Sequence, residues 1–240
     1  MIVLFTDFSL SDPYLGQVKN VLLQHTHNIQ IVDLLHNAPG FDIKSSAYLL
    51  DSYRKDFPAN AVFLCVVDPG VGGPRKACAI KLKEQWFVGP ENGLFNVLLT
   101  RNQGYQYYHL TNTSISASTT FHGRDIFAPA VAKLAMGLLP EMVQQDNTPD
   151  LAGIANDYAH VIYIDHFGNL ISGVRYNNLD KNSNVYFNNI KLINAKTFCD
   201  VNAGEAFYYS NSSGLLEIAV NKGSAQHFFN ANIGDDILIN

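Results

Sequence analysis

Charged side chains are scarce in this sequence, and that scarcity limits the partners it can have. Asp, Glu, Lys and Arg make up 15% of the 240 residues, against roughly 25% in an average soluble protein. The net charge is −5, and no run of five basic residues occurs. These features argue against nucleic acid or an anionic membrane as the main partner. So sparsely charged a surface favours an oligomer that covers part of it.

Cysteine is also rare, with three residues and no Cys-x-x-Cys pair. Cys65 and Cys78 lie in apolar, strand-like stretches, which is typical of reduced cysteines in a core. Cys199 is left over as the odd one. The sequence therefore predicts neither a disulfide framework nor a zinc site.

Long apolar segments are missing as well. No apolar stretch approaches the 18 residues that a membrane-spanning helix needs. The first residues, Met1 to Phe5, form a short apolar run without the basic region and long apolar region of a secretory leader. We therefore expect a cytoplasmic protein without a membrane span.

The sequence divides into two regions that differ in the spacing of their apolar residues and in the frequency of turns. Residues 1–140 alternate short apolar runs with segments of helical spacing, which predicts an α/β domain with a mainly parallel sheet. Residues 141–152 are polar and are predicted to be a linker. Residues 153–240 contain short strands and frequent turns without a clear amphipathic helix, which indicates a small β-barrel or sandwich domain.

Polar side chains follow two apolar strands of the first region. Asp7 comes directly after the strand that begins at Ile2, and Asp68 comes directly after the strand at 61–67. Ligands of open α/β sheets bind at the carboxyl ends of strands. Each segment alone is also compatible with a tight turn, so the position of the two aspartates is the informative feature.

Common catalytic motifs are absent: the sequence contains no HExxH, GxSxG, Walker or GxGxxG pattern. The segments 120–125, 165–169 and 211–214 each resemble a helix cap or a hairpin turn when taken alone. A divalent-metal site is the alternative for one set of side chains, namely Asp7, Asp12, Asp68, His122 and Asp125. Their spacing is not diagnostic, and no metal is predicted.

Five segments in order nevertheless resemble one family. They are Thr6-Asp7-Phe8 with Asp12-Pro13-Tyr14, Val67 to Gly72, Pro90-Glu91-Asn92-Gly93-Leu94, Thr120 to Asp125, and Asp165-x-Phe167-Gly168-Asn169. Together they resemble the SAM hydroxide adenosyltransferases, adenosine-forming hydrolases of S-adenosylmethionine (SAM) that are related to fluorinase and chlorinase. The resemblance spans residues 1 to about 228.

The resemblance implies a fold, an assembly and a set of site residues. It implies an N-terminal α/β domain, a C-terminal β-barrel, and a homotrimer that binds SAM between subunits. It implies a catalytic triad that holds the attacking water, made of Asp68, Arg75 and His122. Among the substrate-binding residues it implies, Asp7 would bind the ribose, Asp165 and Asn169 the methionine end or the ribose, and Ser212 the methionine carboxylate. Phe198 and the backbone near Ala225 would bind the adenine. Asp12, Asn92 and Phe121 lie in the same matched segments and are expected to bind substrate as well.

The chemistry so implied needs no metal or cofactor, because the sulfonium of SAM already makes methionine a good leaving group. Water or hydroxide would attack the ribose 5′ carbon, and Arg75 would favour hydroxide character in the attacking water. His122 or Asp68 would orient the water or accept its proton, and the sequence does not decide which of the two is the base.

The sequence departs from the family pattern at a few positions. Ser9 and Asn20 stand where glycine is usual, Glu91 stands where aspartate is usual, and Ser172-Gly173 replaces Thr-Asn. None of these departures falls on the triad.

Two alternatives remain at this stage. A halogenase is disfavoured because only a short segment joins Arg75 to Pro90, and because Gly123 stands where the fluorinase has a halide-binding serine. A non-catalytic SAM-binding trimer is disfavoured because the whole triad is present.

Overall fold

The chain folds into two compact units in this computed structural model, which describes residues 1–111, 117–147, 149–180 and 182–240. One unit comprises Met1–Leu50 and Phe57–Ile154, and the other comprises Asp51–Asp56 and Ala155–Asn240. Among the described residues, no helix has both the length and the apolar character to cross a bilayer. The domain boundaries predicted from the sequence stay predictions.

The first unit is built on a seven-stranded sheet in the order β2-β1-β3-β5-β4-β6-β7. Its strands are β1 (Ile2–Thr6), β2 (Ile31–Leu35), β3 (Val62–Val66), β4 (Ala77–Leu82), β5 (Gln85–Pro90), β6 (Tyr105–Leu110) and β7 (Met142–Gln144). The pairs among β2, β1, β3 and β5 are parallel, whereas β4 pairs antiparallel with β5 and β6, and β6 with β7.

The expected mainly parallel sheet is therefore a mixed sheet. The reason is local: the two residues Lys83 and Glu84 connect β4 to β5, and so short a connection permits only antiparallel pairing. A second difference lies in the predicted linker at 141–152, since β7 falls inside it and forms the sheet edge. Residue 148 of that range lies outside the described residues.

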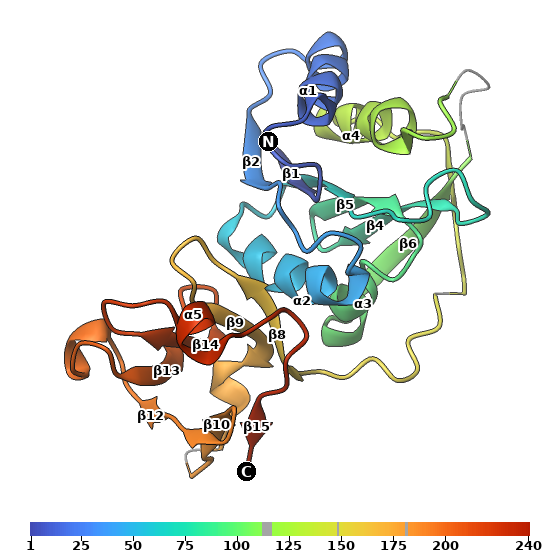
Figure 1. The fold of residues 1–240 in the computed structure, drawn as a ribbon. Helices are drawn as coiled ribbons and strands as arrows, with labels where there is room; N and C mark the ends of the chain where they lie inside the picture. The colour runs from blue at the N-terminus through green and yellow to red at the C-terminus, as the bar shows by residue number, and fades with distance from the viewer. Residues whose placement is uncertain (112–116, 148, 181) are drawn as a thin grey trace. The chain divides into compact units, whose positions relative to one another are not determined.

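Helices cover both faces of this sheet (Figure 1). They are α1 (Pro13–His25), α2 (Ile43–Tyr53), α3 (Asn96–Arg101), α4 (Ala128–Ala135) and a π-helical turn η2 (Gly123–Phe127), whereas the 3-10 turn η1 (Arg54–Asp56) belongs to the other unit. The apolar spacing predicted at 14–24 is seen on α1, where Leu15, Val18 and Leu22 are buried in one core with β1, β3 and α4. This packing fixes the strand ends that carry Asp7 and Asp68.

The second unit contains a five-stranded sheet, β12-β13-β14-β9-β8, and a three-stranded sheet, β11-β10-β15. Its strands are β8 (Tyr158–Ile164), β9 (Leu170–Arg175), β10 (Val185–Phe187), β11 (Ile190–Lys191), β12 (Ile193–Asn194), β13 (Ala206–Ser210), β14 (Leu215–Val220) and β15 (Leu238–Ile239). Short helical turns are η3 (Tyr176–Asn178), η4 (Phe198–Asp200) and α5 (Ala225–Phe229). One core joins both sheets, and closure into a barrel stays a prediction.

Candidate active site

Asp7 and Asp68 lie side by side at the carboxyl ends of two parallel strands. Thr6 of β1 is in register with Val66 of β3, and the Asp7 amide donates to the Val66 carbonyl oxygen at 3.2 Å. Burial raises the pKa of the Asp7 carboxyl above its usual value, and the negative charge of Asp68 raises it further. The two carboxylates therefore lie at the edge of the sheet where ligands of open α/β sheets bind.

Arg75 joins the two other residues that the resemblance assigned to the triad. Its Nε donates to Oδ1 of Asp68 at 2.9 Å, and its Nη2 donates to Oδ2 of the same carboxylate. The same Nη2 lies 2.9 Å from Nδ1 of His122. The Arg75 and Asp68 side chains are 10% and 4% exposed, so this is a buried ion pair with a neighbouring imidazole.

The contact with Arg75 fixes the hydrogen-bonding role of His122. A guanidinium can only donate, so Nδ1 of His122 must accept, and the proton of a neutral ring is then on Nε2. Burial lowers the pKa of His122, and the Arg75 charge lowers it further. Both effects favour the neutral imidazole, which in this contact offers an Nε2–H donor.

A small cavity of about 90 Å³ lies against these groups, and Asp7, Asp68, Phe121 and His122 are among its lining residues. The rings of Phe8, Tyr14 and Phe121 pack on one another with centroids 5.5–6.0 Å apart.

This aromatic packing also accounts for Gly123, which lines the same cavity. A Cβ at Gly123 would stand 3.1 Å from Cζ of Phe8 and 3.5 Å from Cε2 of Phe121. A serine at this position would therefore require the Phe8 ring to shift.

A second network behind the strand ends was missed by the sequence reasoning. The buried His36 bonds Oγ1 of Thr6 through Nδ1 at 2.8 Å and Oδ1 of Asp33 through Nε2 at 3.0 Å, and Lys19 pairs with Asp33 at 2.6 Å. The Ser9 amide donates to the His36 carbonyl oxygen. Ser9 has φ of 64°, a left-handed conformation that glycine adopts without strain, which explains why glycine is usual there.

Three predicted residues of this unit, Arg75, Asp12 and Asn92, are not among those lining this cavity; Arg75 lies behind it, bonded to Asp68 and His122. Asp12 is an exposed residue at the N-terminus of α1, and its side chain makes no capping bond. Asn92 donates from Nδ2 to the Val67 carbonyl oxygen at 2.9 Å and accepts from the Leu94 amide at 3.2 Å. Asn92 thus ties the loop after β5 to the end of β3.

Acidic side chains at this edge do not form a metal cluster in the described residues, where no group of three or more His, Cys, Asp or Glu is disposed to hold an ion. Asp125 faces elsewhere: its carboxylate accepts from Arg124 Nε at 2.6 Å and from the Ser118 amide at 2.8 Å. Asp68 and His122 are engaged by Arg75 instead.

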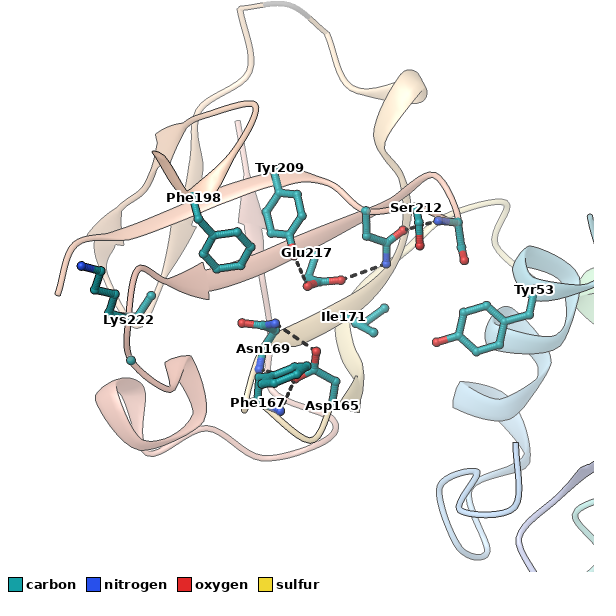
Figure 2. A pocket seen from close by; sticks show the side chains of 14 residues that line it. Tyr53, Asp165, Phe167, Asn169, Ile171, Phe198, Tyr209, Ser212, Glu217 and Lys222 are labelled. Carbon is teal, nitrogen blue, oxygen red and sulfur yellow. Dashed lines mark hydrogen bonds between the residues drawn. The ribbon is translucent and has the colours of Figure 1, made fainter. Parts of the chain in front are cut away.

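The second unit holds a separate cavity lined by four predicted residues: Asp165, Asn169, Phe198 and Ser212 (Figure 2). Asp165 organises its own loop, because Oδ1 accepts from the amides of Phe167 at 2.9 Å and Asn169 at 2.8 Å, and Oδ2 accepts from Asn169 Nδ2 at 2.9 Å. The loop is therefore fixed before any ligand arrives.

Ala225, the remaining predicted residue, does not line this cavity: it is fully buried in the core at the start of α5. The α5 backbone is nevertheless tied to the same loop, since the Gln226 amide donates to the Gly168 carbonyl oxygen at 2.8 Å. A Cβ on Gly168 would stand 2.0 Å from Oγ of Ser224, so glycine is required for this approach.

The sequence reasoning missed other residues of this second cavity, chiefly Tyr209, Asn211 and Glu217. Burial raises the pKa of Glu217 and of Tyr209, and each is hydrogen-bonded to the other. By contrast Ser172, one of the departures from the family pattern, is buried in β9 and donates to the Leu216 carbonyl oxygen at 2.8 Å. Ser172, although it departs from the family pattern, therefore takes part in the hydrogen bonding of the sheet.

Comparison with known proteins finds matches to one family over nearly the whole chain. Residues 2–144 match the SAM hydroxide adenosyltransferase N-terminal domain, and residues 159–238 match the C-terminal domain. A (R)-S-adenosyl-L-methionine hydrolase of Thermus thermophilus is 35% identical, with 92% of each chain covered. A fluorinase of Actinopolyspora mzabensis is 24% identical, covering 100% of this chain and 96% of the other. A crystal structure of an uncharacterized conserved protein from Thermotoga maritima superposes with a TM-score of 0.89 at 32% identity, covering 100% and 99%. This chain belongs to the SAM hydroxide adenosyltransferase family.

Proposed function

We propose that the protein hydrolyses SAM to adenosine and L-methionine, with water attacking the ribose 5′ carbon. The observation that carries the proposal is the buried Arg75 held between Asp68 and His122, beside a cavity that also receives Asp7. Relatives at up to 35% identity are named (R)-S-adenosyl-L-methionine hydrolases, which supports the same substrate and reaction.

The reaction balances without a cofactor. The water oxygen forms a bond to the 5′ carbon while the carbon–sulfur bond breaks, and that electron pair returns to sulfur. Methionine thus leaves as a neutral thioether, so no general acid is needed. The water gives up one proton, which ends in solvent, and adenosine keeps the new 5′ hydroxyl.

The hydrogen bonds suggest how the triad divides this work. Arg75 supplies a permanent positive charge that favours hydroxide character. His122 has its Nδ1 engaged with Arg75, so it holds the water oxygen through Nε2–H and does not take the proton. Asp68 keeps acceptor capacity beyond its two bonds from Arg75, and we assign it as the proton acceptor.

The rest of the substrate needs more room than the first cavity has. Cavities for ligands of drug size start at about 300 Å³, whereas this one measures about 90 Å³. It accommodates the water and the reacting carbon, with Asp7 at the ribose.

We assign the second cavity to the ends of SAM, with Asp165, Asn169 and Ser212 toward methionine and Phe198 toward adenine. Exposed aromatics, Phe41 at the first cavity and Phe167 at the second, favour coverage by another surface. We infer a homotrimer in which the first unit of one subunit and the second unit of the next complete each site.

Three further features stay with the proposal. The names of the related hydrolases specify the (R) epimer of SAM, and we propose that this protein prefers it. As predicted from the sequence, we also propose that the second unit closes into a barrel and that the protein is cytoplasmic. The halogenase alternative is less favoured, because the Phe8 ring beside Gly123 leaves no space for a serine without movement.

Oxygen-18 water tests the reaction directly. The protein is incubated with (R)- and (S)-SAM separately in labelled water, and the adenosine formed is analysed by mass spectrometry. We expect one label in the 5′ hydroxyl and faster turnover of the (R) epimer. Free adenine, unlabelled adenosine, or 5′-halogenated adenosine in the presence of chloride would contradict the proposal.

A further inference from the structure

Glu217 is the one charged residue in a wholly buried strand. It stands in β14, whose sequence is Leu-Leu-Glu-Ile-Ala-Val, and it is 5% exposed. Its side chain reaches the wall of the second cavity, where Figure 2 shows it between Tyr209 and the turn that carries Ser212. Burying a carboxylate costs free energy unless hydrogen bonds compensate it, so its partners indicate what it does.

Both partners of Glu217 donate to it. The hydroxyl of Tyr209 donates to Oε1, and Nδ2 of Asn211 donates to Oε2 at 3.0 Å. The orientation of the Asn211 amide is fixed independently, because its Oδ1 accepts from the amides of Ser213 at 3.0 Å and Leu215 at 2.9 Å. Asn211 therefore has only its Nδ2 donor left for Glu217.

The backbone of the same turn is closed around Asn211. The Asn211 amide donates to the Leu215 carbonyl oxygen at 2.9 Å, and the Gly214 amide donates to the Asn211 carbonyl oxygen at 3.0 Å. Ser212 lies within this turn and is exposed to the cavity. The buried carboxylate thus reaches the turn through a single side chain.

We propose that Glu217 is a positioning residue for substrate binding: it holds the Asn211 side chain, and through it the turn at 211–214 that presents Ser212 to the cavity. This inference rests on the proposed function, which places the methionine end of SAM there. Glu217 itself need not touch the substrate.

The proposal distinguishes a hydrogen-bond role from a charge role. Glutamine at this position could offer its oxygen to Asn211 and its amide N–H to the Tyr209 oxygen, since a phenol can accept as well as donate. Glu217→Gln should therefore retain the turn, whereas Glu217→Ala should lose it. A role that depended on the negative charge would be lost in both variants.

The experiment measures kcat and KM for SAM with Glu217→Ala, Glu217→Gln, Asn211→Ala and the Glu217→Ala/Asn211→Ala pair. Glu205→Ala is the matched control, because Glu205 also holds a turn, through the Asn202 amide at 2.9 Å, but does not line the cavity. Thermal unfolding of each variant shows whether it is folded. Asn211→Ala and Glu217→Gln keep the test usable if Glu217→Ala fails to fold.

We expect Glu217→Ala and Asn211→Ala each to raise KM by about tenfold, with kcat within about threefold, because the turn contacts substrate before and during reaction alike. The double variant should be no worse than the more affected single variant, since both changes break one linkage. Glu217→Gln and Glu205→Ala should keep the wild-type KM.

Three results would overturn the inference: an unchanged KM in folded Asn211→Ala, additive losses in the double variant, or a Glu217→Gln as impaired as Glu217→Ala. A wild-type protein that releases no adenosine from SAM would instead overturn the proposed function itself, and is seen before any variant is made.

Discussion

The two cavities of this protein differ in how their polar groups are held. In the first, a guanidinium lies between a carboxylate and an imidazole, and Arg75 and Asp68 are a buried ion pair. In the second, Asp165 and Glu217 accept hydrogen bonds from neutral groups, namely backbone amides, side-chain amides and a phenol. An ion pair thus organises the groups at the first cavity, whereas neutral donors hold the two carboxylates of the second.

This difference assigns different tasks to the two units. A charged group that is already oriented acts on charge that develops during reaction. Turns fixed by side-chain bonds instead recognise groups that do not change, such as a carboxylate or a purine. We therefore expect substitutions in the first cavity to lower kcat and substitutions in the second to raise KM.

The largest expected effect comes from Arg75→Lys. Lysine keeps the charge but cannot bond Asp68 and His122 at once with a planar fork. We expect kcat to fall by about 100- to 1,000-fold, the usual loss for a group that stabilises the transition state, while KM for SAM changes little. Steady-state kinetics with thermal unfolding provide the measurement.

Arg175→Lys is the matched control for that variant. Arg175 binds Asp157 with the same two-pronged geometry, at 3.0 and 2.9 Å, in the second unit, but its partner Asp157, unlike Asp68, lines neither cavity. It should keep kcat even if stability falls. If Arg75→Lys retained wild-type kcat, the role of Arg75 and the contrast between the cavities would both be wrong.

A mixing experiment tests whether the two cavities meet between subunits. His122→Ala impairs the first cavity and Asn169→Ala impairs the second, so each homotrimer should be nearly inactive at a SAM concentration below the wild-type KM. In trimers formed from equal amounts of both, random assembly gives about a quarter of the sites two intact halves, because a ring repeats one heterologous interface. We expect about a quarter of wild-type activity after co-refolding. Recovery no greater than the sum of the two variants alone would show that each site lies within one subunit.

Parts of this picture were predictable from local sequence and parts were not. The aspartates after β1 and β3 were found because parallel strands bring their ends to one edge. The mixed character of the sheet was underestimated, although the two-residue connection between β4 and β5 already required an antiparallel pair. Asp12 was taken from a matched segment and the backbone near Ala225 from the wider resemblance, and neither match tells which side chains reach a cavity.

The residues that were missed belong to contacts between distant segments. His36 lies 30 positions from Thr6, and no local pattern marks it. Glu217 did leave a signal, since it interrupts an otherwise apolar strand, and a lone acid there indicates a buried hydrogen-bonded role. Its partners, Tyr209 and Asn211, could be named only once the pairing of β13 with β14 was known.

The smallest expected effect is a shift in the pH dependence of the rate. Burial and the Arg75 charge lower the pKa of His122, and the proposed mechanism needs its neutral form. A lowered pKa keeps the ring neutral to more acidic pH, so the acid limb of kcat/KM assigned to His122 should lie below the ordinary value of about 6.5. Asp125 opposes this, because its charge raises the pKa of His122.

Asp125→Asn should therefore move that limb to still lower pH, by a fraction of a unit, with the plateau rate nearly unchanged. Glu141→Gln is the control: it removes the same charge from an exposed pair with Lys133 and should leave the limb in place.

The raised pKa of Asp7 could produce an acid limb as well, but Asp125 is not among the groups that shift the pKa of Asp7. A limb that moves only in Asp125→Asn belongs to His122. Two results would contradict this: an acid limb of kcat/KM at or above pH 6.5 in the wild type, or one that does not move in Asp125→Asn. Either would show that the rate does not require a neutral His122, and that the first cavity works through Asp68 and Arg75 alone.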